Sequence, residues 1–204
     1  MRESFKKSNN LNIRPFCPRK ASKTIHSSLG FVQYETHERI IIYGIDHFRE
    51  IAVMEDWPGD GTSSNTFIIE GYNITDSYGD LIVIHDTNVY FIIRDNYLNG
   101  LTETWGGILF YNVINGIVDE NIVENIDILG IGAYFSGNLI ISDNKVENTN
   151  LNGIRIEACP GPATLTNNTI TNSVEAGIWI GDSSNKTTIR RNTIYENQYG
   201  IVFN

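Results

Sequence analysis

Residues 130–148 read GIGAYFSGNLIISDNKVEN, and residues 153–172 read GIRIEACPGPATLTNNTITN. Both stretches open with Gly-Ile and then carry a short apolar run followed by asparagine. The Gly-Ile pair recurs with spacings of 23, 23, 24 and 23 residues, at Gly107, Gly130, Gly153, Gly177 and Gly200. A fixed period of this length is typical of proteins built from stacked repeats.

Within each repeat, apolar and other residues alternate with a period of two, as Ile154, Arg155 and Ile156 do. This is the periodicity of a strand rather than of a helix. A unit of about 23 residues is too short for a propeller blade, which needs about 40–45, and it lacks the Leu-x-x-Leu-x-Leu pattern of leucine-rich repeats. The sequence therefore predicts an all-β fold, a single-stranded parallel β-helix with one repeat per coil. The preferred hand of parallel crossovers makes it right-handed.

Asparagines recur at two positions of the repeat. Equivalent residues of successive coils lie about 4.8 Å apart, so stacked side-chain amides can bond from coil to coil. Asparagine also tolerates left-handed backbone and suits a sharp corner. We expect two structural ladders, the first formed by Asn121, Asn144, Asn168 and Asn192 and the second by Asn125, Asn148 and Asn172 with Asp76 in register.

The chain divides into three predicted parts. Residues 1–30 are polar and basic and are expected to form a disordered arm. Residues 31–64 are expected to form an N-terminal cap of one strand and one short helix with Asp46 as its N-cap, and residues 65–204 the β-helix. No matching cap follows at the C-terminal end, which favours a fragment of a longer surface protein and leaves end-to-end self-association of the last coil open.

Composition limits the class of function. The net charge is −9 although the arm is basic, so the body is acidic and nucleic-acid binding is not expected. No stretch has the apolar length of a signal peptide or a membrane span. Cys17 and Cys159 give no metal-binding spacing and are either one disulfide or two separate thiols.

Residues 39–204 resemble the right-handed parallel β-helix repeat proteins, a group with a pectin lyase-like fold that includes carbohydrate-binding proteins and sugar hydrolases. Residues 57–72 and 88–94 carry the most specific part of the likeness. They resemble the opening of archaeal surface β-helix proteins related to a periplasmic copper-binding β-helix family. The resemblance implies an extracellular or cell-surface location. Copper would need imidazole, thiolate or thioether ligands, and this chain has two Met, two Cys and four dispersed His.

Outward positions at equal offsets after each Gly-Ile should form rows on one lateral face. This face would carry the candidate substrate-binding residues Tyr111, Tyr134, Arg155, Glu157, Trp179 and Asp182. Aromatic rings and planar polar groups suit a sugar, whose apolar ring face stacks while its hydroxyls form hydrogen bonds. A solvated face that covers its sheet with aromatic side chains is the competing interpretation.

Catalysis is a second possibility on the same face. Glu157 and Asp182 fall on successive coils, and a glycosidase needs two carboxylates separated by about 5–9 Å, one of them held protonated. Nothing in the sequence indicates such a protonated carboxyl.

A second face is acidic, because Asp95, Glu120 and Asp143 share one offset. Calcium would relieve the repulsion between stacked carboxylates, and so would solvent and neighbouring basic residues. Calcium is therefore an open possibility, and no other cofactor is predicted. Trp105 lies in the longest turn of the repeats, where it could make contacts or pack against the coil.

The leading functional prediction is a non-catalytic β-helix module that binds a glycan or a protein partner on the lateral face. A polysaccharide hydrolase or lyase is the first alternative, and a purely structural spacer is the second.

Overall fold

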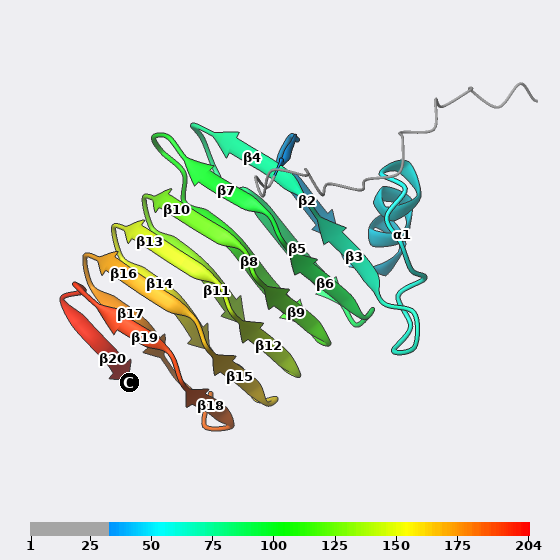
Figure 1. The fold of residues 1–204 in the computed structure, drawn as a ribbon. Coiled ribbons are helices and arrows are strands. Elements are labelled where there is room, and N and C mark those ends of the chain that lie inside the picture. The colour runs from blue at the N-terminus through cyan, green and yellow to red at the C-terminus, as the bar shows by residue number, and fades with distance from the viewer. Residues whose placement is uncertain (1–32) are drawn as a thin grey trace, which may run out of the picture.

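The computed structural model describes residues 33–204. The chain winds as a parallel β-helix whose coils each add one strand to three sheets (Figure 1). Successive strands pair in parallel with their equivalents one coil away, as Ile108, Ile131 and Ile154 do in the second sheet. The predicted fold class is confirmed. The predicted arm, residues 1–30, lies outside the described residues.

Sheet 1 contains the strands of the asparagine corner, four of which (β7, β10, β13 and β16) directly follow a buried asparagine. Its order is β1 (Glu35–Thr36), β4 (Tyr72–Asp76), β7 (Tyr97–Gly100), β10 (Ile122–Ile126), β13 (Lys145–Thr149), β16 (Thr169–Ser173) and β19 (Thr193–Tyr195).

Sheet 2 contains two N-terminal strands and then the five strands that carry the Gly-Ile pairs. Its order is β2 (Ile40–Tyr43), β5 (Ile82–Thr87), β8 (Gly106–Val113), β11 (Leu129–Tyr134), β14 (Asn152–Glu157), β17 (Ala176–Ile180) and β20 (Tyr199–Phe203).

Sheet 3 completes the coil. Its order is β3 (Phe67–Glu70), β6 (Phe91–Arg94), β9 (Gly116–Asp119), β12 (Leu139–Ser142), β15 (Ala163–Thr166) and β18 (Thr187–Arg190).

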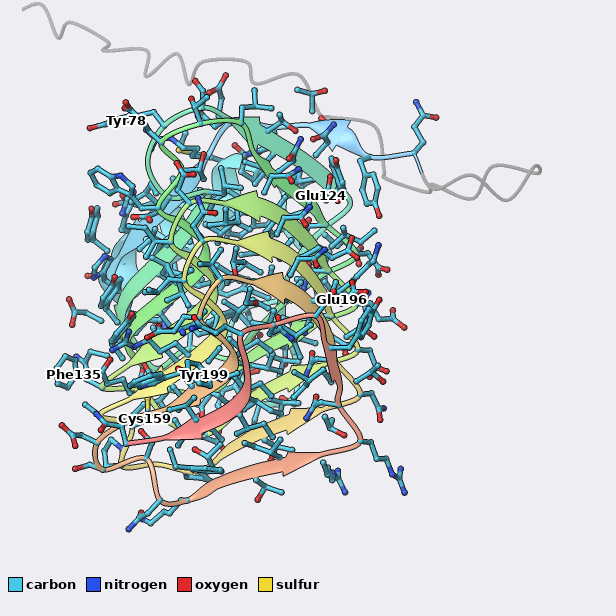
Figure 2. The ribbon with its side chains drawn as sticks, turned by 90° about the vertical axis from the view of Figure 1, so that its left-hand side faces the viewer. Tyr78, Glu124, Phe135, Cys159, Glu196 and Tyr199 are labelled. Carbon is cyan, nitrogen blue, oxygen red and sulfur yellow. The ribbon has the colours of Figure 1, made fainter. Side chains whose placement is uncertain are left out.

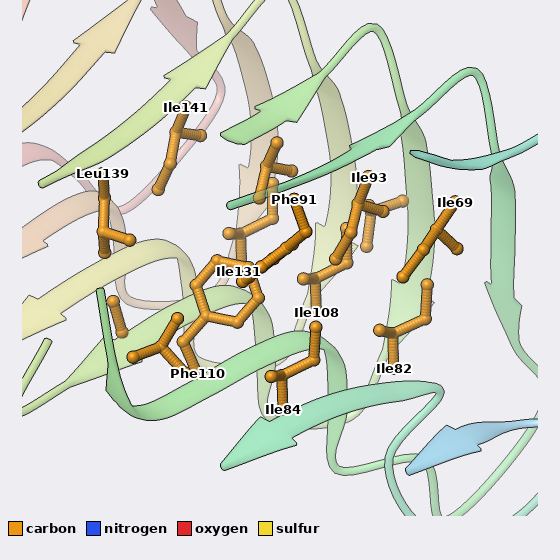
Figure 3. Close-up of a cluster of buried hydrophobic side chains, with 14 of the residues drawn as sticks. Ile69, Ile82, Ile84, Phe91, Ile93, Ile108, Phe110, Ile131, Leu139 and Ile141 are labelled. Atoms are coloured by element: carbon orange, nitrogen blue, oxygen red, sulfur yellow. The ribbon is translucent and has the colours of Figure 1, made fainter. Parts of the chain in front are cut away.

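The core fills the space between the three sheets. Ile69, Ile93 and Ile141 of sheet 3 point toward residues of sheet 2 such as Ile108 and Phe110, and all five are fully buried (Figure 3). Because the inward residues stack on their equivalents in both neighbouring coils, each coil depends on the next for its burial.

The glycines that set the period are required by close approach of the next coil. A Cβ at Gly130 would overlap the side chain of Val146 and lie 2.6 Å from the carbonyl oxygen of Gly153. A Cβ at Gly153 would lie 2.8 Å from the carbonyl oxygen of Gly177. The backbone of each coil therefore passes through the space that a side chain would occupy, which explains why glycine recurs in sheet 2.

The first asparagine ladder is buried and contains one member more than predicted. Asn96 joins it in the earlier coil, where its Nδ2 group donates to Asn121 Oδ1 at 3.0 Å. Oδ1 of Asn144 accepts both the backbone and a side-chain N–H of Asn121, each at 3.0 Å, and its Nδ2 group donates to Asn168 Oδ1 at 3.0 Å. Asn96, Asn121, Asn144 and Asn168 have no exposed surface.

The left-handed residue at this corner is not the ladder asparagine itself. The residue that precedes the ladder asparagine is left-handed instead, as at Asp95, Glu120 and Asp143, where φ is 51°, 53° and 55°. The ladder asparagines act through their side chains instead. In the second ladder Asn125, Asn148 and Asn172 are left-handed as expected, and they donate in turn to Asn99, Asn125 and Asn148 at 2.8, 3.0 and 3.2 Å. Asp76 was expected in the same column, but it pairs with Gly100, and its Oδ1 atom accepts the backbone N–H groups of Ser77 and Tyr78 instead.

A third polar column, which the sequence did not suggest, runs through the corner after sheet 2. In each coil a side-chain atom accepts a backbone N–H from the coil before it. Ser136 Oγ accepts from Val113, Cys159 Sγ accepts from Ser136, and Ser184 Oγ accepts from Cys159. Cys159 is buried at this corner with a free thiol, and burial raises its pKa (Figure 2). The thiol thus takes the place of a serine hydroxyl. Its suggested partner, Cys17, lies outside the described residues.

One helix, α1 (Gly44–Met54), follows β2 and packs by Phe48 and Ala52. The Phe48 ring stacks on Phe67 with centroids 5.3 Å apart. The prediction that Asp46 is the N-cap is wrong. Gly44 adopts φ of 79° and lets the chain turn into the helix directly after Tyr43, so the helix begins earlier.

The strands β1 and β2 extend sheets 1 and 2, and the division into a cap (31–64) and a β-helix (65–204) stays a prediction. At the other end, β18, β19 and β20 are terminal strands, and Phe203 is 72% exposed. End-to-end association through this coil also stays a prediction.

Candidate functional site on the outer face of sheet 2

The outer face of sheet 2 carries the rows that the repeat predicts. Tyr111 pairs with Tyr134, and Tyr134 pairs with Glu157, so these side chains occupy equivalent positions on three successive coils. In the neighbouring row Gly132 pairs with Arg155, and Arg155 pairs with Trp179. The structure therefore brings together five of the six predicted binding residues.

Four rings stack along this face in what we call the ring ladder, formed by Tyr43, His85, Tyr111 and Tyr134. The centroid separations are 4.8, 4.7 and 5.1 Å, and the interplanar angles are 21°, 11° and 8°. Because each ring covers the face of the next, His85 and Tyr111 present edges to solvent. The sequence-based expectation that these ring faces would stack on sugar does not suit this geometry, which offers ring edges and phenol hydroxyls.

A small apolar cluster lies beneath the ring ladder, outside the main core. Val83, Leu109 and Leu129 are 3–5% exposed, and Tyr111 and Tyr134 pack against them. Burial raises the pKa of both tyrosines. The two phenols are therefore neutral at physiological pH and can each donate one hydrogen bond.

The face becomes polar beyond Tyr134. Nε and Nη2 of Arg155 both lie 2.6 Å from Oε2 of Glu157, and the guanidinium lies 5.3 Å from the ring centroid of Trp179. In the same region Asn152 donates to Glu175 at 2.8 Å. The ion pair and the cation–π contact hold Arg155 between Glu157 and the tryptophan ring.

Asp182 lies in the turn after β17. Ile156 pairs with Ile180, whereas the backbone N–H of Ala158 bonds to the carbonyl oxygen of Asp182 at 2.8 Å. One extra residue is therefore present in the later coil, and Gly181 and Asp182 together lie opposite Glu157. Asp182 is exposed, and Glu157 already accepts a hydrogen bond from Nε of Arg155 and forms an ion pair with its Nη2 atom.

The acidic corner does not gather its carboxylates around a common point. Within residues 33–204, no group of three or more His, Cys, Asp or Glu side chains could hold a metal ion. Asp95, Glu120 and Asp143 are the left-handed corner residues described above. Burial raises the pKa of Asp95, and Arg94 opposes that shift.

Asp80 is a neighbour of this face that the sequence did not single out. A Cβ at Gly106 would lie 2.9 Å from its Oδ1 atom, and this buried oxygen has no hydrogen-bond partner among residues 33–204. Burial raises the pKa of Asp80, and the charges of Arg39 and His85 oppose the shift. The sequence offered one signal, which is position in the repeat. Asp80 occupies the position equivalent to Gly106, because Ile82 pairs with Ile108 in the next coil.

The chain belongs to the right handed beta helix region family, whose model matches residues 60–194. No curated protein matches the chain. Within residues 33–204, no helix is long and apolar enough to cross a membrane.

Two solved structures illustrate the structural likeness. One is a mutant of the periplasmic alginate epimerase AlgG, with a TM-score of 0.47, 16% identity, and coverage of 67% of this chain and 45% of that one. The other is the A-module of mannuronan C-5 epimerase AlgE4 from Azotobacter vinelandii, with a TM-score of 0.46, 14% identity, and coverage of 66% and 47%. The chain thus spans less than half of either structure, and likenesses at this level do not transfer the epimerase activity to it.

Proposed function

We propose that the protein is a non-catalytic β-helix module that binds a glycan along the outer face of sheet 2. The observation that carries this proposal is the in-register succession of Tyr111, Tyr134, the Arg155–Glu157 pair and Trp179 over four coils. Because stacking and ion pairing already hold these groups, binding requires little further loss of side-chain freedom.

The chemistry of this face suits hydroxyl-rich ligands. Tyr111 and Tyr134 can each donate one hydrogen bond outward, the Arg155 guanidinium offers further donors, and Glu157 offers an acceptor. Sugar hydroxyls both donate and accept, so they can use all these groups. The contact would be made through ring edges rather than through the covered ring faces of the ladder.

A polysaccharide hydrolase or lyase is the second candidate, and Asp80 is the observation that favours it. Its pKa is raised by burial, as a general acid requires. Asp80 lies at the position of β5, three coils from Glu157 in β14. At about 4.8 Å per coil the component of their separation along the stack is already roughly 14 Å, beyond the span of a glycosidase pair. Asp80 would have to act with nearer groups such as His85.

The test is retention of the protein on a panel of polysaccharides, with the products examined for new chain ends. Trp179→Ala removes the half-buried ring beside Arg155 and should weaken binding about tenfold or more. Tyr195→Ala removes an exposed aromatic residue from sheet 1 of the next coil and serves as the matched control.

Retention that Trp179→Ala loses and Tyr195→Ala keeps, without new ends, supports the binding module. New reducing or unsaturated ends would identify an enzyme and would direct attention to Asp80 and His85. Absence of retention on every polymer would refute the proposal and favour a protein partner or a spacer.

A further inference from the structure

We propose that the Tyr78–Trp105 pair, on two adjoining turns, forms a stacking site for the pyranose ring of an uncharged glycan. This inference rests on the proposed function, because it takes the ligand to be a glycan. It adds a site outside the predicted binding residues and assigns the class of sugar.

The pair exposes aromatic surface that the ring ladder hides. Tyr78 is 54% exposed and Trp105 is 49% exposed, and Leu101 beside them is 60% exposed. The two ring centroids are 5.6 Å apart with an interplanar angle of 57°, so the rings are tilted and do not cover each other face to face. Figure 2 shows Tyr78 at the periphery of the coil stack. An aromatic face that is open to solvent can stack on the apolar face of a sugar ring.

The backbone that carries the pair is held rigidly. The turn at residues 76–80 and the turn at residues 101–105 belong to successive coils and are joined by hydrogen bonds. The backbone N–H of Trp105 donates to the carbonyl oxygen of Gly79 at 3.1 Å, and that of Gly79 donates to the carbonyl oxygen of Glu103 at 3.0 Å. The backbone N–H of Leu101 donates to the carbonyl oxygen of Asp76 at 2.9 Å.

Side chains strengthen the same connection. Thr104, which is fully buried, donates through Oγ1 to the carbonyl oxygen of Asp76 at 3.1 Å, and Arg39 donates to the carbonyl oxygen of Tyr78 at 3.1 Å. The positions from which Tyr78 and Trp105 project are therefore fixed before any ligand arrives. A rigid aromatic pair loses little entropy on binding, which is the property of effective contact residues.

The charges around the pair indicate an uncharged ligand. Asp76 and Asp80 stand on either side of Tyr78, and Glu103 precedes Trp105 by two residues. Arg39 contacts this group, and its Nε atom lies 3.3 Å from Asp76, so its charge is already partly balanced. A uronic acid polymer would meet repulsion here, whereas a neutral sugar would not.

The pair also adjoins the proposed binding face. Trp105 immediately precedes Gly106, the first residue of β8, and the same strand carries Tyr111 of the ring ladder. One extended glycan could therefore contact both the turns and the sheet.

The experiment compares wild type, Trp105→Ala, Tyr78→Phe and Trp179→Ala by affinity electrophoresis in gels containing a neutral β-glucan or a polyuronate, at low salt. Trp105→Ala should weaken retention by the neutral polymer about tenfold or more, because an exposed stacking partner is lost. Tyr78→Phe keeps the ring and should retain binding. Because the Trp105 side chain is half exposed, its removal should not prevent folding, and circular dichroism of Trp105→Ala serves as the control for this.

Three results would overturn the inference. If Trp105→Ala binds like wild type while Trp179→Ala does not, the stacking site is refuted and the proposed function stands. If the polyuronate is retained more strongly than the neutral polymer, the assigned sugar class is wrong. If wild type binds neither these polymers nor the wider panel, the proposed function fails and the inference fails with it.

Discussion

Removing one amide from the buried asparagine ladder should destabilise the protein far more than changing the exposed ladder four residues away. In Asn144→Ala, the backbone N–H of Asn121 loses its acceptor in a site with no exposed surface. Leaving this buried donor without a partner costs about 1–3 kcal/mol. The side-chain hydrogen bonds of Asn144 with Asn121 and Asn168 are lost as well, at about 0.5–1.5 kcal/mol each, which brings the total to about 2–6 kcal/mol. The amide of Asn144 also donates to Val118 and Ser142.

Asn148→Gly is the matched change on the same coil. Its amide bonds to Asn125 and Asn172 at an exposed corner, where water can replace both contacts. Glycine is chosen because φ is 55° at this residue and alanine would add backbone strain. The expected loss is about 1 kcal/mol or less.

The free energy of unfolding of both variants would be measured from urea melts followed by tryptophan fluorescence and by circular dichroism. Coincidence of the two probes would show that the stack unfolds as one unit. Equal losses in the two variants, or a loss below about 1 kcal/mol for Asn144→Ala, would refute the idea that burial makes the first ladder the stronger one.

Three further outcomes follow from the packing. Gly130→Ala should lower the melting temperature, because its Cβ would overlap the next coil, whereas Gly200→Ala, with nothing within 4 Å, should not. Cys159→Ser should leave the free energy of unfolding nearly unchanged. Cys159→Ala should lower it by about 1–2 kcal/mol, because the backbone N–H of Ser136 in the neighbouring coil loses its acceptor. Urea melts that rank the two variants in the opposite order would contradict this. A hydrogen bond to Glu124, together with burial, raises the pKa of Tyr97 to about 12. The stability that its neutral phenol contributes is present below pH ~10 and lost as pH rises toward 12, so Tyr97→Phe should flatten the decline in melting temperature across that range.

The coil and its register could be predicted from the sequence because both follow from the period. Once Gly107, Gly130 and Gly153 are aligned, the outward rows and both asparagine ladders follow by counting. The same counting placed Tyr111 beside Tyr134, and their stacked rings confirm that they are neighbours.

The orientation of side chains could not be counted in this way. Whether Tyr111 and Tyr134 present faces or edges depends on torsions that the coil spacing selects, since rings on strands about 4.8 Å apart can stack on each other. The partnership of Tyr78 with Trp105 was also missed, because it joins two turns of irregular length that share no offset. The start of α1 was misplaced for a local reason, because Gly44 permits an earlier turn than Asp46 indicated.

The equivalence of the coils bears on how this molecule can lengthen or shorten. Excising residues 131–153 would join Gly130 to Ile154, recreate a Gly-Ile junction and leave every remaining column aligned. The stack would contract by one rise, about 4.8 Å. Deleting a single residue inside a strand would instead turn each following side chain toward the opposite side. Within the strands, gains and losses of a whole turn thus keep the register, and they would move the surface groups on either side apart or together in uniform steps.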